Sequence, residues 1–412
     1  MTVADHPAAS GGRGGAMLGL GAAALMATLV VLTVGSRVLV GTEDTDLYGR
    51  YAGLVGQGRV PYRDFLVEYP PVALPFLVVP ALAARAGGGY KAAFAGEMLL
   101  CHAVAVVLVT RRVIRREGPG PLAARLAWLA LVTLILGRLI VTRYDAAPMV
   151  VGFAASLAWA SGRGGLGGAL AALGVGLKIY PAAPALVALV GDRGCPAGAR
   201  RRGAVAFALT AAGLGSAWLA IGGPSGVAAS IRFQAGRGFE YGSLYSGGQM
   251  LAARVAGVPI TVARDHSSFS TTTPWSGALL PWVFPIQAAS VLAVAAVFAR
   301  RGGREGLRYQ GAAVLAFIVA GKVFSPQFLI WLVPYVAVLE GPIARRGRWL
   351  FVAACALTLI APGLVGFSGR TGLGSILAYN VRNVLLLGLF GLLVSGPLAP
   401  ADDRTGPGRA PG

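Results

Sequence analysis

Long apolar segments joined by short arginine-rich connections are the feature that most constrains how this chain folds. The segments are continuous rather than alternating in polarity, which favours membrane-spanning helices over the strands of a barrel. Hydrophobic residues make up 56% of the chain and charged residues 13%, whereas soluble domains carry roughly a quarter charged residues. We therefore predict an all-α integral membrane protein of about 12 transmembrane helices. The predicted spans are 17–40, 92–110, 121–141, 146–161, 165–177, 181–191, 203–222, 277–299, 310–321, 327–340, 348–366 and 376–397.

Basic residues orient these spans, because short loops rich in Lys and Arg stay on the cytoplasmic side of a membrane. Four clusters are expected there: Arg111–Glu117, Arg200–Arg202, Arg300–Arg308 and Ala344–Arg348. An even number of spans then places both termini in the cytoplasm. The clusters also account for much of the net charge of +20. They lack the interleaved aromatic residues of single-strand binders, so no nucleic acid partner is expected.

Three segments take their interpretation from this orientation. Pro70–Gly89 is too short and too rich in proline to span, so it is predicted as a juxtamembrane helix on the outer face, within the first outer loop. A helix break at Lys178–Pro181 keeps the Arg200 cluster inside, and Lys322–Phe328 is a second break by the same argument. Irregular backbone at membrane depth is tolerated where it lines a cavity, so both breaks point to an outward-facing cavity.

A single membrane domain accounts for most of the chain. We predict a cytoplasmic tail over residues 1–16, a multi-span domain over 17–398 and a disordered cytoplasmic tail over 399–412. The first apolar segment is expected to be a retained helix rather than a removed signal peptide. The protein is therefore expected in the plasma membrane as a multi-pass protein, with its active site facing outside.

Carboxylates concentrate in the first outer loop of a chain that has only 16 of them. Five fall within residues 42–71: Glu43, Asp44, Asp46, Asp64 and Glu68. Asp44 and Asp46 directly follow the first predicted span, where partial desolvation would make a carboxylate a better base. The plainer interpretation is that these acids only contribute to the charge asymmetry of the loops, although Asp and Glu contribute little to it.

Two of the three lysines of the chain stand at the two predicted breaks. Lys178 and Lys322 are thus candidates for binding a phosphate oxygen in the outer cavity, with Arg143 and Arg237 as further cations. The alternative is that these lysines extend toward the membrane interface without a ligand. A cavity that combines carboxylates with cations suits the transfer of a sugar from a lipid phosphate to a hydroxyl group.

The order of several motifs resembles that of a known family. The motifs are Asp46–Tyr48, Pro61–Pro71, Arg143–Asp145, Lys178–Pro181, Arg237–Leu251 and Lys322–Pro334. Together they resemble glycosyltransferase family 87, the polyprenol-phosphate-mannose-dependent mannosyltransferases of the C-type (GT-C) membrane superfamily. The resemblance covers most of residues 40–340.

This resemblance implies an inverting transfer of a hexose, mannose in that family, from a polyprenyl-phosphate donor to a lipid or glycan acceptor. It places the catalytic base on Asp46, with Asp44 as the rival, and implies no metal and no cofactor. Lys178, Lys322 and Arg237 are then expected at the donor phosphate. The expected substrate-binding residues are Asp44, Tyr69, Arg143, Asp145, Glu240 and Gln327.

Two other function classes fit parts of the sequence. A transporter or lipid flippase would also use broken helices and intramembrane charges, but its halves often match, and here the acidic outer loop has no counterpart. An outer-polysaccharide polymerase or ligase shares the lipid-phosphate chemistry, but would be expected to carry a large outer loop late in the chain rather than at 223–276.

Overall fold

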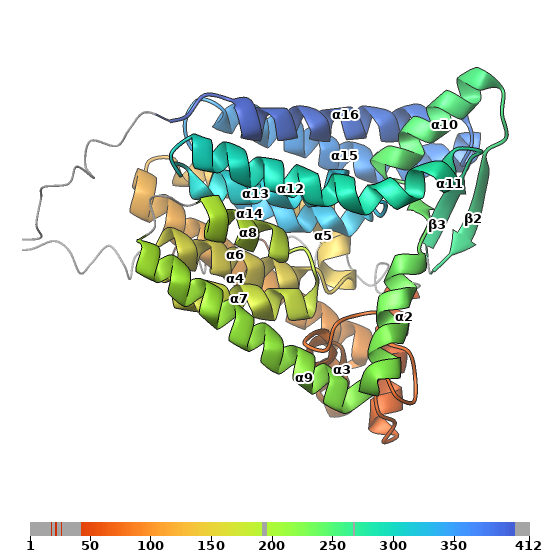
Figure 1. Cartoon of the computed structure of the whole chain (residues 1–412), viewed down its shortest axis with the longest axis horizontal. Helices are drawn as coiled ribbons and strands as arrows, with labels where there is room; N and C mark the ends of the chain where they lie inside the picture. Colours follow the sequence, from red (N-terminus) through yellow and green to blue (C-terminus); the bar gives the residue numbers. More distant parts are fainter. Residues whose placement is uncertain are drawn as a thin grey trace, which may run out of the picture.

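The computed structural model describes residues 18, 21–22, 26, 43–191, 196–266 and 268–399. Helices predominate in it, as predicted (Figure 1). The elements are α2 (Glu43–Gly56), α3 (Ala73–Ala83), η1 (Ala84–Gly88), α4 (Tyr90–Glu117), α5 (Leu122–Thr142), α6 (Ala146–Ala160), α7 (Gly164–Leu177), α8 (Ala182–Gly191), α9 (Ala197–Gly236), β1 (Phe239–Glu240), α10 (Leu244–Ala256), β2 (Thr261–Asp265), β3 (Ser268–Thr272), α11 (Ser276–Leu279), η2 (Leu280–Trp282), α12 (Val283–Arg300), α13 (Gly306–Val319), η3 (Pro326–Leu332), α14 (Val333–Ala337), α15 (Ala344–Ser368) and α16 (Leu373–Ser395).

The described residues contain five helices long and apolar enough to cross a membrane. They are Tyr90–Glu117, Leu122–Thr142, Ala197–Gly236, Ser276–Arg300 and Leu373–Ser395, and each overlaps most of a predicted span. The predicted total of twelve is not confirmed. Several of the remaining predicted spans coincide with shorter apolar helices, such as α6, α7 and α13. The first predicted span, 17–40, lies outside the described residues except at four positions.

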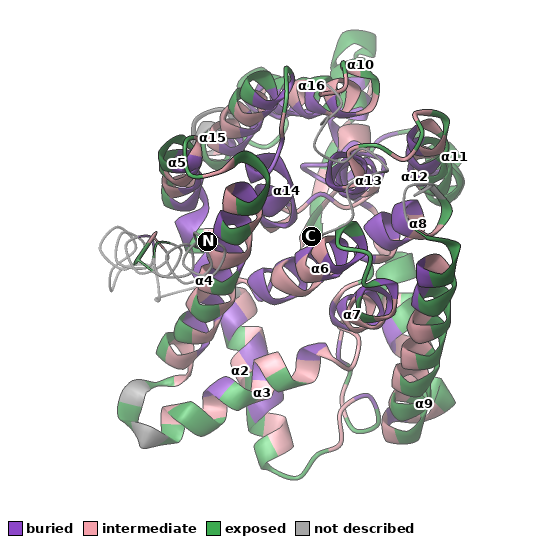
Figure 2. Ribbon diagram, turned by 90° about the vertical axis from the view of Figure 1, so that its left-hand side faces the viewer, coloured by how far each residue is buried: buried purple, intermediate pink, exposed green. Residues whose placement is uncertain are grey.

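Helix α13 forms the centre of the bundle. Nearly all of its residues are buried, and it packs against α8, α12 and α16. Helix α9 lies at the periphery and is mostly exposed (Figure 2), so its apolar surface is available to lipid. Glycines bring α9 close to α7: a Cβ on Gly164 or Gly168 would collide with the α9 backbone.

Both predicted breaks are confirmed. Helix α7 ends at Leu177 and α8 begins at Ala182, because Pro181 disfavours helical geometry at the residue before it. Helix α13 ends at Val319 and η3 begins at Pro326. Each gap is a non-helical turn that contains extended residues, Lys178 in the first and Ser325 in the second. The two turns bring Lys178 and Lys322 to the same end of the bundle as α2 and β1.

The segment predicted as a surface helix forms α3. At 11 residues it is about 16 Å long, roughly half the thickness of a bilayer core. The elbow before it contains Tyr62, which has a positive φ of 67°. Tyr62 packs onto α9, where a Cβ on Gly222 or Gly226 would collide with it. These two glycines therefore allow the loop that precedes α3 to pack closely against the C-terminal half of α9.

A small sheet departs from the all-helical prediction. The sequence suggested one long outer segment over 223–276, but α9 continues through a kink at Gly223 to Gly236. Three short antiparallel strands follow in the order β1-β3-β2, with Phe239 opposite Thr271 and Ala263 opposite Ser270. The sheet lies at one end of the bundle (Figure 1), and β1 carries Glu240 into the site described below.

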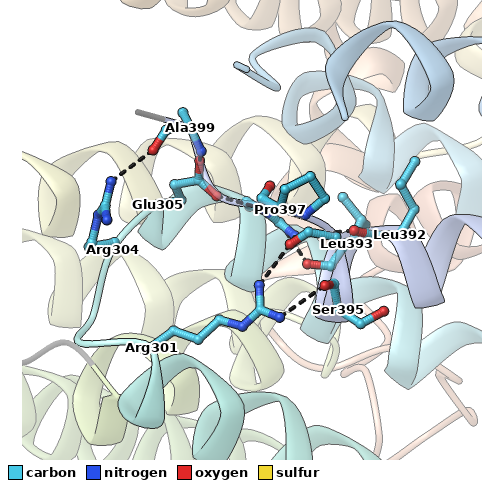
Figure 3. A network of polar contacts seen from close by, with 10 residues as sticks. Arg301, Arg304, Glu305, Leu392, Leu393, Ser395, Pro397 and Ala399 are labelled. Atoms are coloured by element: carbon cyan, nitrogen blue, oxygen red, sulfur yellow. Dashed lines mark hydrogen bonds and ion pairs between the residues drawn. The ribbon is translucent and has the colours of Figure 1, made fainter. Parts of the chain in front are cut away.

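Arginines stabilise the opposite end of the bundle. In the connection from α12 to α13, Arg301 donates hydrogen bonds to the carbonyl oxygens of Ser395 and Gly396 at the end of α16 (Figure 3). Arg308 makes the largest contribution: it donates to the carbonyl oxygens of Leu392, Leu393, Gly396 and Pro397, and to Glu305. A cation at these carbonyls also complements the negative end of the helix dipole.

Replacing Arg308 with methionine is expected to lower the free energy of unfolding by about 3 kcal/mol, because buried carbonyls and Glu305 lose their donor. The melting temperature of the detergent-purified protein measures this. Arg304→Ala is the matched control: the exposed Arg304 makes one hydrogen bond, to Ala399 O, and its loss is expected to cost about 0.5 kcal/mol or less. Equal melting temperatures for the two variants would contradict the role of Arg308.

Candidate functional site

The two predicted breaks and the first outer loop converge on a buried ion pair. Lys178 Nζ donates to Asp145 Oδ1 at 2.7 Å, and Trp331 Nε1 donates to the same oxygen at 2.7 Å. Asp145 is only 1% exposed. The Lys178 ammonium also faces the rings of Tyr144, Phe328 and Trp331 at 4.8–5.1 Å, which adds cation–π attraction. Asp145 and Lys178 thus neutralise each other beneath an aromatic cover.

Helix α2 places the two rival bases on opposite faces. Residues two apart on a helix are rotated by about 200°, so Asp44 and Asp46 point in different directions. Asp44 pairs with Arg143, just before the buried Asp145, and both side chains are mostly buried. Asp46 pairs with Lys91 at 2.8 Å and is 54% exposed. The structure therefore brings Asp44 into the cluster and leaves Asp46 outside it.

Strand β1 adds Glu240 to the cluster. Its backbone N–H donates to Lys322 O at 2.9 Å, and Ser325 Oγ donates to Glu240 Oε1 at 2.7 Å. The second oxygen, Oε2, is buried without a hydrogen bond within the described chain and lies 3.9 Å from Arg237 Nη2. Burial raises the pKa of Glu240, against the opposing effects of Arg237 and Ser325.

Arg237 and Lys322 are neighbouring cations, and among the described residues only Arg237 forms an ion pair, a long one of 3.9 Å to Glu240 Oε2. Arg237 donates to Ser268 Oγ at 3.2 Å, and Lys322 Nζ donates to Ala235 O at 2.7 Å. Burial and, next, the positive charge of Arg237 lower the pKa of Lys322. Neither cation has a hydrogen bond to a carboxylate in the described residues. Two adjacent cations of this kind attract an anion.

Electrostatic interactions connect these groups into one site. Lys178 interacts with both Arg143 and Arg237, and Glu240 interacts with Arg143 as well as with its own neighbours. The cluster therefore mixes carboxylates and cations from α2, the α5–α6 turn, the two breaks and β1. Among the described residues there is no group of three His, Cys, Asp or Glu able to hold a metal ion.

Tyr69 and Gln327 lie beside the cluster. The Tyr69 ring packs against Tyr144, with ring centroids 4.8 Å apart, and its hydroxyl is 3.5 Å from that of Tyr48. Tyr69 is thus part of an aromatic support. Gln327 is half-buried in the first turn of η3, next to Phe328, which covers Lys178.

Glu68 belongs to the carboxylate cluster noted in the sequence, but it was not predicted as a site residue. It lies in the loop before α3, is half-buried, and its carboxylate interacts with Arg237, His266 and Lys178. The clustering of carboxylates within residues 42–71 is the sequence feature that could have indicated Glu68. Its position depends on the contact of this loop with α9, which is not visible in the sequence.

No protein-family model matches this sequence, and no curated protein matches it.

Proposed function

We propose that this protein is a membrane hexosyltransferase that transfers a sugar, mannose in the first instance, from a polyprenyl phosphate to a hydroxyl of a lipid or glycan acceptor. The observation that carries the proposal is a single site that combines a carboxylate oriented by arginine, Asp44 with Arg143, and the adjacent cations Arg237 and Lys322. The first suits a hydroxyl group and the second a phosphate leaving group.

The transfer we propose is an inverting displacement. Asp44 accepts the proton of the acceptor hydroxyl as its oxygen forms a bond to the anomeric carbon. The bond from that carbon to the phosphate oxygen breaks on the opposite face, and the oxygen keeps the electron pair. Arg237 and Lys322 stabilise the resulting lipid phosphate, and Asp44 later releases its proton to water. Glu240 Oε2, which has no hydrogen bond in the described chain, is placed to accept one from a sugar hydroxyl.

We also propose that the site faces the outside of the cell. Arg112 pairs with Glu340, Arg348 donates to Leu339 O, and Arg308 lines a small cavity together with Leu339. The basic clusters that contain these arginines therefore lie at one end of the bundle, and the site lies at the other end of α13. Positive loops stay inside, which supports an outward-facing site with α3 lying on the outer membrane surface. Both lipid substrates would then reach the site from the outer leaflet.

The test is transfer of radiolabelled mannose from polyprenyl phosphate mannose to endogenous lipids, in membranes that contain the protein or an empty vector. Protein-dependent labelling of lipid is expected. Repeating the assay with polyprenyl phosphate glucose as the donor then tests the specificity for the transferred sugar. Absence of labelling with both donors would contradict the proposal. Uptake or flipping of the labelled lipid without transfer would instead favour a transporter, which the two confirmed helix breaks would also suit.

A further inference from the structure

Three consecutive backbone carbonyls in the loop before α3 accept hydrogen bonds from side chains. The bonds run from Ser230 Oγ to Val67 O (2.8 Å), from Gln234 Nε2 to Glu68 O (2.9 Å) and from Tyr62 Oη to Tyr69 O (2.8 Å). Two of the donors belong to α9, and Tyr62 itself rests on glycines of α9. The backbone on both sides of Glu68 is thereby fixed relative to the helix that leads to Arg237.

Among the described residues, the Glu68 carboxylate differs from the neighbouring carboxylates in forming no hydrogen bond and no close ion pair. Within the described chain, no hydrogen bond or ion pair reaches it, whereas Asp44, Asp145 and Glu240 are each engaged. The ionisable groups that face it are Arg237, His266, Lys178, Tyr51, Tyr69 and Tyr144. A half-buried carboxylate on a fixed backbone, with free lone pairs and facing cations, is prepared to accept hydrogen bonds from a ligand.

We propose that Glu68 is the residue that recognises the transferred sugar, accepting hydrogen bonds from hydroxyl groups of the hexose. This inference rests on the proposed function. Its location supports the role: Glu68 interacts with Arg237, one of the two cations assigned to the donor phosphate, so a sugar attached to that phosphate lies within reach. An ionised carboxylate accepts with two oxygens and can bind two neighbouring hydroxyls at once.

Binding measurements on the full-length protein in nanodiscs test this role. The probes are polyprenyl phosphate mannose, polyprenyl phosphate glucose and bare polyprenyl phosphate, each competing with a photoreactive lipid phosphate. Glu68→Gln is expected to lower the affinity for the sugar-bearing lipid that wild type binds more tightly by about tenfold to a hundredfold, the effect of losing hydrogen bonds to a charged group. The affinity for the bare lipid phosphate is expected to stay within about twofold.

Two further variants keep the test falsifiable. Asp64→Asn removes the same charge from the same loop. Asp64 is exposed, and among the described residues its carboxylate accepts a hydrogen bond only from the nearby Val60 N–H, so all affinities are expected to remain unchanged. Glu68→Asp keeps the charge and shortens the side chain, and is expected to give an intermediate loss. Melting temperatures of all variants show whether each one is folded.

The pH dependence gives an independent readout. Burial raises the pKa of Glu68 above its ordinary value of 4.5, against the opposing effects of Arg237, His266 and Lys178. The carboxylate ionises as the pH rises through that raised pKa, so affinity for the sugar-bearing lipid, relative to the bare lipid, is expected to increase with pH above 4.5. The Glu68→Gln variant is expected to lose this dependence.

Each outcome decides the matter. An equal loss for sugar-bearing and bare lipids, no loss in Glu68→Gln, or a pH dependence that the variant retains would overturn the role of Glu68. Wild-type protein that binds bare and sugar-bearing lipids equally would overturn it as well, while leaving lipid-phosphate recognition intact. Wild-type protein that binds neither lipid would refute the proposed function itself, and the role of Glu68 would fall with it.

Discussion

Replacing Asp44 with asparagine is expected to reduce hexose transfer by about 100-fold to 10,000-fold, the usual contribution of a general base. Asparagine keeps the size of the side chain and one oxygen acceptor but cannot take up the acceptor proton. Its contact with Arg143 loses the ion pair, so the melting temperature must be measured beside the transfer rate. Binding of the donor lipid is expected to stay near the wild-type value, which separates a chemical defect from a binding defect.

Asp46→Asn is the comparison that makes this result specific. Asp46 is two residues away, carries the same charge, and pairs with Lys91 on an exposed face. Exposed ion pairs contribute about 0–1 kcal/mol, so this variant is expected to transfer sugar within about twofold of wild type. The opposite ranking, an inactive Asp46→Asn and an active Asp44→Asn, would return the base to the residue that motif order alone suggests.

The choice between Asp44 and Asp46 also shows which part of the site the sequence alone can predict. The sequence shows that Asp44 and Asp46 both follow the first predicted span, but choosing between them requires knowing which face of α2 meets Arg143. That face depends on how α2 packs against the α5–α6 turn. Motif order carries no information on this packing: it suggests Asp46 with Asp44 as the rival, whereas the side-chain contacts favour Asp44.

The fold follows the sequence most closely where composition and proline act locally. The breaks before α8 and η3 coincide with Pro181 and Pro326, and α3 forms where an apolar stretch is too short to span. The sheet of β1, β2 and β3 was not predicted, because its strands are only two to five residues long and β1 pairs with a strand that follows only after α10, as Phe239 does with Thr271. Glu68 was missed for the same reason: Ser230 and Gln234, which hold its loop, are more than 160 residues away.

Lys178 and Asp145 present the sharpest difference between expectation and arrangement. The sequence suggested that Lys178 binds the donor phosphate and Asp145 a sugar hydroxyl. In the fold, Lys178 Nζ lies 2.7 Å from Asp145 Oδ1, beneath the rings of Tyr144, Phe328 and Trp331. An ammonium already neutralised by a buried carboxylate has less attraction for a phosphate than Arg237 or Lys322. We therefore infer that the pair joins the first break to the α5–α6 turn, while Trp331 of η3 connects the second break to the same carboxylate.

Removing one partner of this pair is expected to be severe. Lys178→Met or Asp145→Asn alone should lower the free energy of unfolding by about 3–5 kcal/mol, because each leaves its partner's charge or hydrogen-bonding capacity uncompensated in a buried place. The double variant is expected to recover to within about 1 kcal/mol of wild type, since paired buried charges can be replaced together at little cost. Thermal unfolding in detergent, read as a double-mutant cycle, measures the recovery.

Transfer activity in the same double variant separates support from substrate contact. If the pair acts only by joining the first break to the α5–α6 turn, the stable double variant is expected to keep sugar transfer within about tenfold of wild type, because one of the two polar contacts to the Asp145 position, that from Trp331 Nε1, is retained by asparagine. A double variant that regains its stability but loses donor binding would show that Lys178 itself contacts the phosphate. The anion site would then extend from Arg237 and Lys322 across the aromatic cover to the first break.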